Sequence, residues 1–373
     1  METCDALIVG GGPAGSTCAA HLHRAGLDVI IADAATFPRD KVCAGWITPP
    51  VVAELRLDTD AYREGQTFQP FTGFRVGLIG GHDEIQTLYD RPVGFGIRRG
   101  EFDHYLLQRS GARVKQQTRI TSILRDDGQW IVNDAIRTPM LVGAGGYGCP
   151  VARWLNGVVR GASLVVAQEA EVAIDAAAGA SIAIERQVPE LYFCRDLNGY
   201  GWCVRKGEYL NVGLGRLDRH SLPAAMAQFV AFLEARKKIP ARRSWPWRGH
   251  AYVVNDTRHR RLVDAGVMLV GDAAGLAYAR SGEGIRPAIE SGLLAAETIV
   301  EAHGHYGRSQ LEPYAQRLLD RFAPGQLSQA LAGMVPAGVK TVLGRRLLHA
   351  PAFVRRIVLD QWFLHRHQPA LSV

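Results

Sequence analysis

The order of apolar and polar residues at the start of the chain predicts a strand, a helix and a second strand. Ala6 to Val9 is an unbroken apolar run, which is typical of a strand buried inside a parallel sheet. A glycine-rich turn follows it, and Ser16 to Ala25 has the pattern of a helix. Asp28 to Ala32 then predicts another strand. The chain therefore begins as a strand, a glycine turn, a helix and a strand.

The pattern between residues 37 and 144 predicts a loop and several short elements. Prolines and a glycine between Phe37 and Pro50 predict a loop with fixed turns. Thr72 to Leu88 reads as two strands around Gly80-Gly81, and His104 to Ser110 as a helix. Further short strands are predicted at 114–117, 120–125, 130–132 and 140–144.

From Ser163 to Arg216 the pattern changes to a period of two, which predicts strands of a second sheet. The clearest strands are 191–194, 201–205 and 209–215, followed by a helix at 222–238. A buried strand returns at 267–270 and leads into a long helix at 285–302. The first domain is therefore expected to be discontinuous, with the sheet domain inserted into it.

The fold class predicted is α/β, with three parts. A Rossmann-like dinucleotide-binding domain is expected over residues 1–71, 95–160 and 251–330. A mainly antiparallel sheet domain, expected to bind the substrate, covers 72–94 and 161–250, and a basic helical tail covers 331–373. A length of 373 residues agrees with about two domains.

Composition restricts the location of the protein and the use of its cysteines. The chain has no apolar run of about 18 residues or more and lacks the basic-then-apolar start of a secretory signal. We therefore expect a cytoplasmic protein. None of the six cysteines forms a C-x-x-C pair, so most are expected to be small buried hydrophobes rather than zinc ligands or disulfide partners.

The net charge of +7 is unevenly distributed. One basic region comprises residues 236–238, 242–243, 248 and 258–261, and the tail carries six basic residues, Lys340, Arg345, Arg346, Arg355, Arg356 and Arg366, against the single acid Asp360. A solvated basic face is the favoured interpretation. The functional alternative is attraction to an acidic protein partner, an acidic substrate or, at most peripherally, a membrane surface. Nucleic acid is not expected, because no recognised nucleic-acid module accompanies the charge.

The glycine turn after the first strand has the spacing of a dinucleotide site. Gly10, Gly12 and Gly15 form G-x-G-x-x-G, in which the glycines allow a tight turn, a close approach of the pyrophosphate and close packing of helix and strand. The helix that follows presents free N–H groups to phosphate. Asp33 ends the second strand, where a carboxylate accepts a hydrogen bond from a ribose hydroxyl. This motif alone leaves FAD and NAD(P) both open.

A second glycine-rich region follows the strand at 267–270. Gly271-Asp272 stands at the strand end, where the aspartate can bond ribityl hydroxyls and the next helix can direct its positive end at a flavin ring. Ser281-Gly282-Glu283-Gly284-Ile285 follows and offers a glycine-lined approach to a flat ring. Alone, Gly-Asp is only a strand-to-turn dipeptide.

Taken together, these motifs resemble those of a known family. The two glycine regions and Arg99-x-x-Phe102-Asp103 are similar to the p-hydroxybenzoate-hydroxylase-fold flavoproteins. Lys41-Val-Cys43-Ala-Gly45-Trp46 and Gly199-Tyr200-Gly201-Trp202 resemble the geranylgeranyl-reductase-like branch. The resemblance covers roughly residues 1 to 300 and implies FAD as cofactor. NAD(P)H and a reduced flavin both stay open as the external reductant.

The resemblance also implies positions for the cofactor. Asp33 is expected on the adenosine ribose, Arg99 near the pyrophosphate or ribityl chain, and Asp272 on the ribityl and phosphate groups. The 282–285 backbone is expected at the pyrimidine end of the flavin, and the 41–46 loop beside the ring. The cofactor-binding residues predicted are Gly10, Gly12, Pro13, Ala14, Gly15, Asp33, Lys41, Ala44, Arg99, Ile120, Gly271, Asp272, Gly282, Gly284 and Ile285.

One motif departs from the family pattern. The third fingerprint of the fold usually reads Gly-Ala-Asp-Gly, whereas this chain has Gly143-Ala144-Gly145-Gly146, which puts the usual handling of NAD(P)H and flavin motion in doubt. The sequence at 143–153 resembles flavoproteins that help to mature tryptophylquinone-dependent amine and amino-acid oxidases. That resemblance implies hydroxylation of a tryptophan in a partner protein.

Catalytic residues are not defined by the sequence, and the candidates have ordinary alternatives. Cys43 is a redox thiol or a small packed residue, and Glu283 a proton shuttle or an acid favoured by a helix N-terminus. Trp46, Tyr200 and Trp202 are predicted to line the substrate pocket, although buried aromatic residues are more often core. Trp245-Pro246-Trp247 is faintly similar to a halogenase signature but lacks the Ile-Pro that follows it there. His349, His365 and His367 are expected at the surface of the tail.

The function expected is FAD-dependent redox chemistry, with three possibilities. The first is a monooxygenase that hydroxylates an aromatic group, possible substrates being a small aromatic molecule or a tryptophan of a partner protein. The second is a reductase of isoprenoid double bonds acting on a polyprenyl molecule. The third is a flavin-binding assembly factor without catalytic activity.

Overall fold

The computed structural model describes residues 1–157, 164–240, 244–254, 260–322 and 337–372. Its centre is a six-stranded sheet with the order β19-β20-β13-β2-β3-β9. The strands are β2 (Ala6–Val9), β3 (Val29–Ala32), β9 (Arg113–Lys115), β13 (Met140–Gly143), β19 (Val263–Asp264) and β20 (Val267–Leu269). All neighbouring pairs are parallel except β19 with β20. The predicted apolar runs form the four central strands, whose residues are almost completely buried.

Five helices and a small four-stranded sheet pack around this sheet. The helices of this half are α1 (Pro13–Arg24), α4 (Arg99–Gln108), α5 (Pro150–Asn156), α8 (Ile285–Glu301) and α9 (Arg308–Phe322). The small sheet has the order β1-β12-β11-β10, from β1 (Glu2–Thr3), β10 (Ile123–Asp126), β11 (Gln129–Val132) and β12 (Ile136–Thr138). Trp130 of β11 is buried and donates a hydrogen bond to the carbonyl of Gly266, which holds the small sheet against β20.

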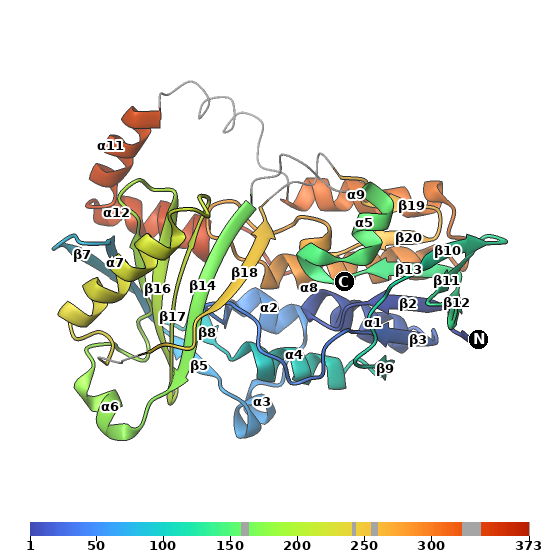
Figure 1. Cartoon of the computed structure of the whole chain (residues 1–373), viewed down its shortest axis with the longest axis horizontal. Coiled ribbons are helices and arrows are strands. Elements are labelled where there is room, and N and C mark those ends of the chain that lie inside the picture. The colour runs from blue at the N-terminus through green and yellow to red at the C-terminus, as the bar shows by residue number, and fades with distance from the viewer. Residues whose placement is uncertain (158–163, 241–243, 255–259, 323–336, 373) are drawn as a thin grey trace.

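A seven-stranded sheet forms the other half of the molecule, on the left in Figure 1. Its order is β18-β14-β17-β16-β15-β6-β7, and only β15 and β6 pair in parallel. The strands are β6 (Gly73–Leu78), β7 (Glu84–Leu88), β14 (Leu164–Ala173), β15 (Glu190–Phe193), β16 (Gly199–Lys206), β17 (Tyr209–Arg216) and β18 (Arg248–Val253). The predicted boundary at residue 250 falls inside β18, which pairs with β14.

The two faces of the seven-stranded sheet are covered by different segments. Cys203 of β16 packs toward α7 (Leu222–Ala235), whereas its neighbours Trp202 and Val204 pack toward the C-terminal tail. This alternation is the period of two that the sequence shows. Helix α6 (Ala176–Ser181) lies in the connection from β14 to β15.

The tail is helical, as predicted, but much of it is not a solvated face. It contains α11 (Ala337–Leu347), α12 (Pro351–Phe353) and the π-helical segment η4 (Val354–Phe363). Leu348, Val354, Val358 and Phe363 are buried in one cluster with residues of the sheet. Beyond η4 the chain returns to the six-stranded sheet half, where the C-terminus lies (Figure 1). The tail therefore joins the two halves of the molecule.

Several elements between residues 46 and 96 were not predicted. A three-stranded sheet with the order β4-β8-β5 is formed by β4 (Trp46–Ile47), β5 (Gln69–Phe71) and β8 (Gly94–Gly96). Helices α2 (Pro49–Glu54) and α3 (Thr59–Gly65) follow β4. α4 begins at Arg99, five residues before the predicted helix. In the described residues, no helix has the length and hydropathy needed to cross a membrane.

Candidate active site

A cavity of about 410 Å³ lies between the carboxyl ends of the parallel strands and the seven-stranded sheet. Segments far apart in the sequence converge on it: the glycine turn after β2, the 39–46 loop, the start of α4, and the 271–288 region. The predicted cofactor residues that line it are Gly10, Gly12, Pro13, Ala14, Asp33, Lys41, Ala44, Arg99, Gly271, Asp272, Gly282, Gly284 and Ile285. This position, outside the strand ends, is where doubly wound sheets bind ligands.

Two predicted cofactor residues do not line the cavity. A Cβ on Gly15 would lie 1.9 Å from the carbonyl oxygen of Gly10, so this glycine permits the close packing of α1 on the glycine turn. Ile120 packs in the hydrophobic core of the six-stranded sheet half.

The first glycine turn has room for a phosphate at one position only. Gly10 has a φ of +115°, and a Cβ there would lie 2.4 Å from the carbonyl oxygen of Ala144. By contrast, a Cβ on Gly12 would meet only the guanidinium of Arg39, at 3.4 Å. Gly12 caps α1, whose first turn carries no acidic residue. The turn therefore suits the pyrophosphate of FAD.

Asp33 is held at the end of β3 by backbone groups. One carboxylate oxygen accepts a hydrogen bond from the N–H of Gly11 at 2.7 Å, and the other from the N–H of Ala35 at 2.8 Å. These bonds fix the carboxylate beside the glycine turn while leaving each oxygen a further lone pair. The predicted bond to the adenosine ribose fits this arrangement.

Basic side chains gather at the cavity wall near the glycine turn. Arg99 makes two hydrogen bonds of 2.9 Å to the fully buried Asp103, and Arg39 lies 3.3 Å from the same carboxylate. Lys41 Nζ lies 2.6 Å from His250 Nε2. Burial and the charge of Lys41 lower the pKa of His250 to about 4, so its ring is neutral at pH 7. Arg99 and Arg39 share the single carboxylate of Asp103, so this part of the wall keeps positive charge that suits an anionic ligand.

The second glycine region shapes another part of the cavity wall. Gly282 has a φ of +67°, and a Cβ there would lie 2.2 Å from the hydroxyl of Tyr252. A Cβ on Gly284 would lie 3.2 Å from Asp272 Oδ1. The N-terminus of α8 begins at Ile285, in the cavity wall. This part of the wall therefore combines a close backbone approach with the positive end of a helix, as expected for a flavin ring.

An aromatic wall, defined as Trp46, Tyr200 and Trp202, bounds the cavity on the side of the seven-stranded sheet. Trp202 donates a hydrogen bond of 2.7 Å to Asn211, and the Tyr200 hydroxyl donates to the carbonyl of Ser281. The indole N–H of Trp46 is buried and has no partner in the described part of the chain. The two tryptophans line the cavity and also pack in the hydrophobic cluster behind it.

Comparison with known proteins identifies the family. Residues 3–323 match the family model described as FAD binding domain. The chain belongs to this FAD-binding family. It is similar to a menaquinone reductase of Mycobacterium tuberculosis, with 29% identity over 332 residues that cover 80% of this chain and 77% of the relative. It is 28% identical over 337 residues to a digeranylgeranylglycerophospholipid reductase of Methanothrix thermoacetophila, covering 84% and 82%.

Solved structures show the same fold. A geranylgeranyl bacteriochlorophyll reductase-like protein from Thermoplasma acidophilum superposes with a TM-score of 0.77 at 22% identity, covering 98% of both chains. The halogenase PltM in complex with phloroglucinol and FAD superposes with a TM-score of 0.68 at 16% identity, covering 98% of this chain and 85% of that one. The predicted fold class, FAD and the geranylgeranyl-reductase-like branch are thus confirmed, and the protein is an FAD-dependent oxidoreductase.

Cys43 lies in this flavoprotein beside two glutamates, Glu169, which is buried, and Glu171, which is half-buried. Its backbone N–H donates to Glu169, whose pKa burial raises to about 7. At Glu171 the charge and hydrogen bond of Lys206 outweigh partial burial and lower the pKa to about 2. These groups border a second cavity of about 70 Å³. Cys43 is half-buried, whereas the other five cysteines are buried, as predicted.

The departure from the family fingerprint lies in the cavity wall. Gly145 and Gly146 both line the cavity. Gly146 has a φ of +71°, and a Cβ there would meet no atom within 4 Å. At Gly145, which stands where family members carry the aspartate, a Cβ would lie 3.2 Å from the Cα of Cys149, so this position has less room than Gly146.

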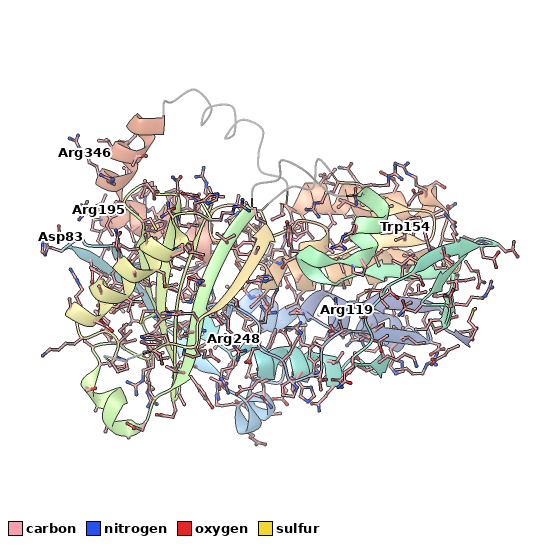
Figure 2. All side chains as sticks on the ribbon, in the orientation of Figure 1. Asp83, Arg119, Trp154, Arg195, Arg248 and Arg346 are labelled. Atoms are coloured by element: carbon pink, nitrogen blue, oxygen red, sulfur yellow. The ribbon has the colours of Figure 1, made fainter. Side chains whose placement is uncertain are left out.

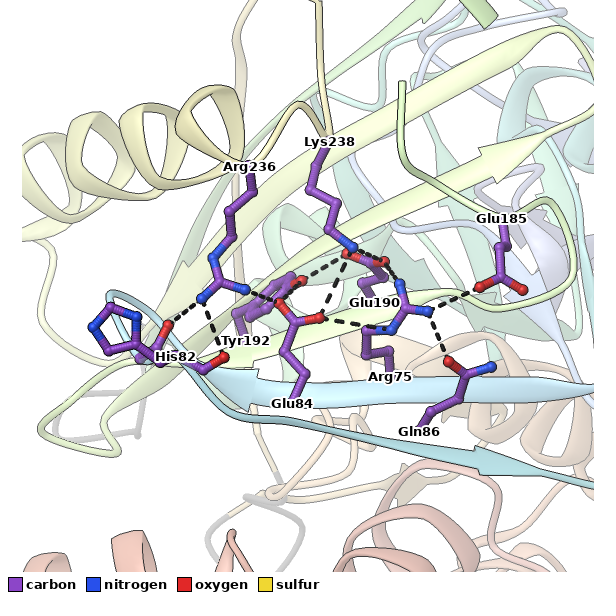
Figure 3. A network of polar contacts seen from close by, with 10 residues as sticks. Arg75, His82, Glu84, Gln86, Glu185, Glu190, Tyr192, Arg236 and Lys238 are labelled. Atoms are coloured by element: carbon purple, nitrogen blue, oxygen red, sulfur yellow. Dashed lines mark hydrogen bonds and ion pairs between the residues drawn. The ribbon is translucent and has the colours of Figure 1, made fainter. Parts of the chain in front are cut away.

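In the basic region at 236–238, the expectation of a solvated face was wrong for Arg236 and Lys238, whereas Lys237 is exposed. Lys238 donates to the fully buried Glu190 at 2.7 Å, and Arg236 pairs with Glu84 (Figure 3). Arg75 bridges the same two glutamates. The cluster ties the end of α7 to β6, β7 and β15. Residues 242–243 and 258–259 of the predicted basic region lie outside the described residues.

The expectation of surface histidines was wrong for His365. Its side chain is buried and stacks on Tyr278 at 3.7 Å between ring centres. His349 and His367 are exposed. His365 lies beside Glu283, a weak catalytic candidate that lines the cavity.

Arg39, His250 and Tyr252 are among the cavity residues that were missed in the sequence. Arg39 lies in a segment that the sequence predicts only as a loop, although its basic side chain could have indicated a phosphate contact. His250 and Tyr252 are two residues apart on β18, so both face the cavity. Their alternation was visible, but nothing in the sequence placed β18 at the edge of the flavin cavity.

Proposed function

We propose that this flavoprotein reduces carbon–carbon double bonds in an isoprenoid chain. The observation that carries the proposal is the aromatic wall. Its three rings carry no charge, and they bound the cavity opposite the glycine turn that suits the FAD pyrophosphate. Such a surface suits the apolar, unsaturated segments of a polyprenyl molecule.

The relatives support the same proposal. Their names describe reductases of menaquinone and of digeranylgeranylglycerophospholipid, which favours the reductase alternative over the aromatic hydroxylation expected first. The halogenase likeness, at 16% identity, concerns the fold. A tryptophan in a partner protein stays the less supported prediction.

The mechanism assigns separate tasks to the chain. When bound, FAD supplies the hydride that one carbon of the double bond receives. The aromatic wall orients the substrate chain and, with the tail packed behind it, keeps water from this side of the cavity. A proton must reach the other carbon, so the site needs an acid close to the wall.

The test uses the purified holoprotein reduced anaerobically with dithionite. A digeranylgeranyl glycerolipid is added in detergent, and the saturated lipid serves as control. We expect the unsaturated lipid to reoxidise the flavin without oxygen and to yield a dihydro product by mass spectrometry. Reoxidation only by oxygen, with an oxygenated aromatic product, would support the monooxygenase instead. Tight FAD binding without turnover of either substrate would support the assembly factor.

A further inference from the structure

Two buried polar side chains from distant segments meet at the edge of the flavin cavity. Glu283 precedes α8, and His365 follows η4 in the tail. Each side chain is 7% exposed, and Glu283 Oε2 lies 3.7 Å from His365 Nε2. Neither oxygen of Glu283 nor the Nε2 of His365 has a hydrogen-bond partner among the described residues. Buried polar atoms are normally satisfied, so this unsatisfied pair requires an explanation.

The structure holds His365 firmly in this position. Its ring stacks on Tyr278 with an angle of 22° between the ring planes, and the Tyr278 hydroxyl bonds Gln368 at 2.7 Å. Arg286, in the first turn of α8, is fully buried and donates to the carbonyls of Gln368 and Pro369, each at 2.9 Å. The segment that precedes Arg286 carries Glu283, so one short stretch positions both members of the pair.

Glu283 also lies next to the aromatic wall. The Tyr200 hydroxyl donates to the carbonyl of Ser281, two residues before Glu283. Burial raises the pKa of Tyr200, and the charge of Glu283 contributes to that increase. The Glu283 side chain therefore lies close to the wall residue Tyr200 on one side and to the tail on the other.

Both groups are uncharged at neutral pH. Burial raises the pKa of Glu283 to about 8 and lowers that of His365 to about 3. Arg286 acts against the first shift, and Arg286 and His367 reinforce the second. The negative charge of Glu290 acts to raise both pKa values. Glu290 itself accepts hydrogen bonds from Arg286 and Arg321, which oppose its charge. The contact is therefore a carboxylic acid facing an imidazole nitrogen, and not an ion pair.

We propose that Glu283 donates the proton that completes double-bond reduction, and that His365 of the tail restores this proton from solvent. This inference rests on the proposed function. As the hydride reaches one carbon, the O–H bond of Glu283 breaks and a C–H bond forms at the other carbon. The carboxylate then takes the proton on Nε2 of His365 while Nδ1 of the same ring takes a proton from solvent, so the ring stays neutral and only changes its tautomer. The tail thus supplies part of the catalytic machinery of this enzyme.

Three variants test the pair. Glu283→Gln removes the acid at nearly constant size, His365→Gln removes the imidazole, and His349→Gln changes an exposed histidine of the same tail as the matched control. We expect Glu283→Gln to slow lipid-driven flavin reoxidation about a hundredfold or more, the usual contribution of a general acid. His365→Gln should slow it less and change its pH dependence. FAD affinity and dithionite reduction should be unchanged in all three.

A second readout does not depend on activity. Infrared spectra of the holoprotein in D₂O at neutral pH should contain the C=O band of a protonated carboxylic acid that is lost in Glu283→Gln and shifted in His365→Gln. If that band is absent from the wild type, or if Glu283→Gln reoxidises at the wild-type rate, the inference is overturned. If the wild type contains the band but no isoprenoid lipid reoxidises its flavin, the proposed function fails, while Glu283 is still shown to be a neutral acid.

Discussion

The ring of Phe363, in the tail, lies 5.1 Å from the ring of Tyr200 in the aromatic wall and nearly perpendicular to it. It also lies 6.3 Å from Trp46, so one tail side chain supports two of the three wall residues. The tail is therefore structural support for the substrate side of the cavity, in addition to carrying His365.

Phe363→Ala should weaken both the fold and the site. Phe363 is fully buried, and removal of such a ring costs about 3–5 kcal/mol of the free energy of unfolding. We expect a raised KM for the isoprenoid lipid and little change in FAD affinity. Denaturant unfolding and steady-state kinetics measure the two effects. Gln361→Ala, on the exposed side of η4, is the control; equal losses in both variants would contradict the prediction.

The glycines of the first turn should separate folding from cofactor binding. Gly12→Ala has space in the folded protein, so the apoprotein should unfold at nearly the wild-type denaturant concentration while FAD affinity falls at least tenfold. Gly15→Ala places a Cβ 1.9 Å from the carbonyl of Gly10 and should destabilise the fold itself. Fluorescence titration with FAD and urea unfolding of the apoproteins measure the two quantities. Wild-type FAD affinity in Gly12→Ala would show that the phosphate lies elsewhere.

Asp272→Ala should reduce the retention of FAD during purification. Asp272 lines the cavity at the end of β20 and adjoins Gly284. Asp264→Ala is the matched control, since Asp264 ends the neighbouring strand β19 and pairs with Arg261 away from the cavity. The flavin-to-protein absorbance ratio of the purified variants is the measurement. An unchanged ratio in Asp272→Ala would exclude the predicted contact with the ribityl or phosphate groups.

Much of this site was predictable because its parts are local. The glycine turn, Asp33 and the 271–285 region each follow a buried strand, and a strand end in a parallel sheet defines where its loop must lie. Trp46, Tyr200 and Trp202 were instead indicated by the resemblance of the 41–46 and 199–202 segments to the geranylgeranyl-reductase-like branch, because β4 itself was not predicted.

The remainder depends on contacts between distant segments. His365 lies in the basic tail. No local sequence pattern shows that Arg286, 79 residues earlier, donates a hydrogen bond to the carbonyl of His365. The same holds for Lys238, which follows α7 and pairs with the buried Glu190 on β15. A charge cluster was read as a solvated face because composition reports charge and not the partner that neutralises it.

The stability of the protein should respond to pH through the buried pair. Glu283 has an ordinary pKa near 4.5 when unfolded and about 8 when folded, so its stabilising effect is complete below about pH 4.5 and is lost as the pH rises toward 8. The loss is about 1.4 kcal/mol per pH unit in that range. Glu283→Gln should therefore gain stability relative to wild type between pH 5 and pH 8. Urea unfolding with excess FAD at both pH values measures the difference, and a constant difference would contradict the raised pKa.

His365 has the opposite pH dependence. Its pKa falls from 6.5 to about 3 on folding, so its stabilising effect is present above about pH 6.5 and is lost as the pH falls toward 3. His365→Gln should therefore flatten the acid limb of the stability profile between pH 6 and pH 4. His349→Gln should leave that limb unchanged, because His349 is exposed. Equal acid sensitivity of wild type and His365→Gln would show that His365 is not buried as a neutral ring.

The exposed basic side chains of the tail should bind an anionic surface if the substrate is an isoprenoid lipid. Arg346 projects from α11 at the end of the molecule near Arg195 (Figure 2), with Val342 and Leu343 exposed on the same helix. Arg346 and Arg356 have no ion-pair partner in the described part of the chain. We expect the double variant Arg346→Glu, Arg356→Glu to lose binding to phosphatidylglycerol vesicles at low salt, and wild-type binding to weaken as salt is added. Co-sedimentation measures both, with phosphatidylcholine vesicles and the reversal Arg308→Glu on α9 as controls. If the double variant binds phosphatidylglycerol vesicles as well as the wild type does, the tail has only its structural and proton-transfer roles.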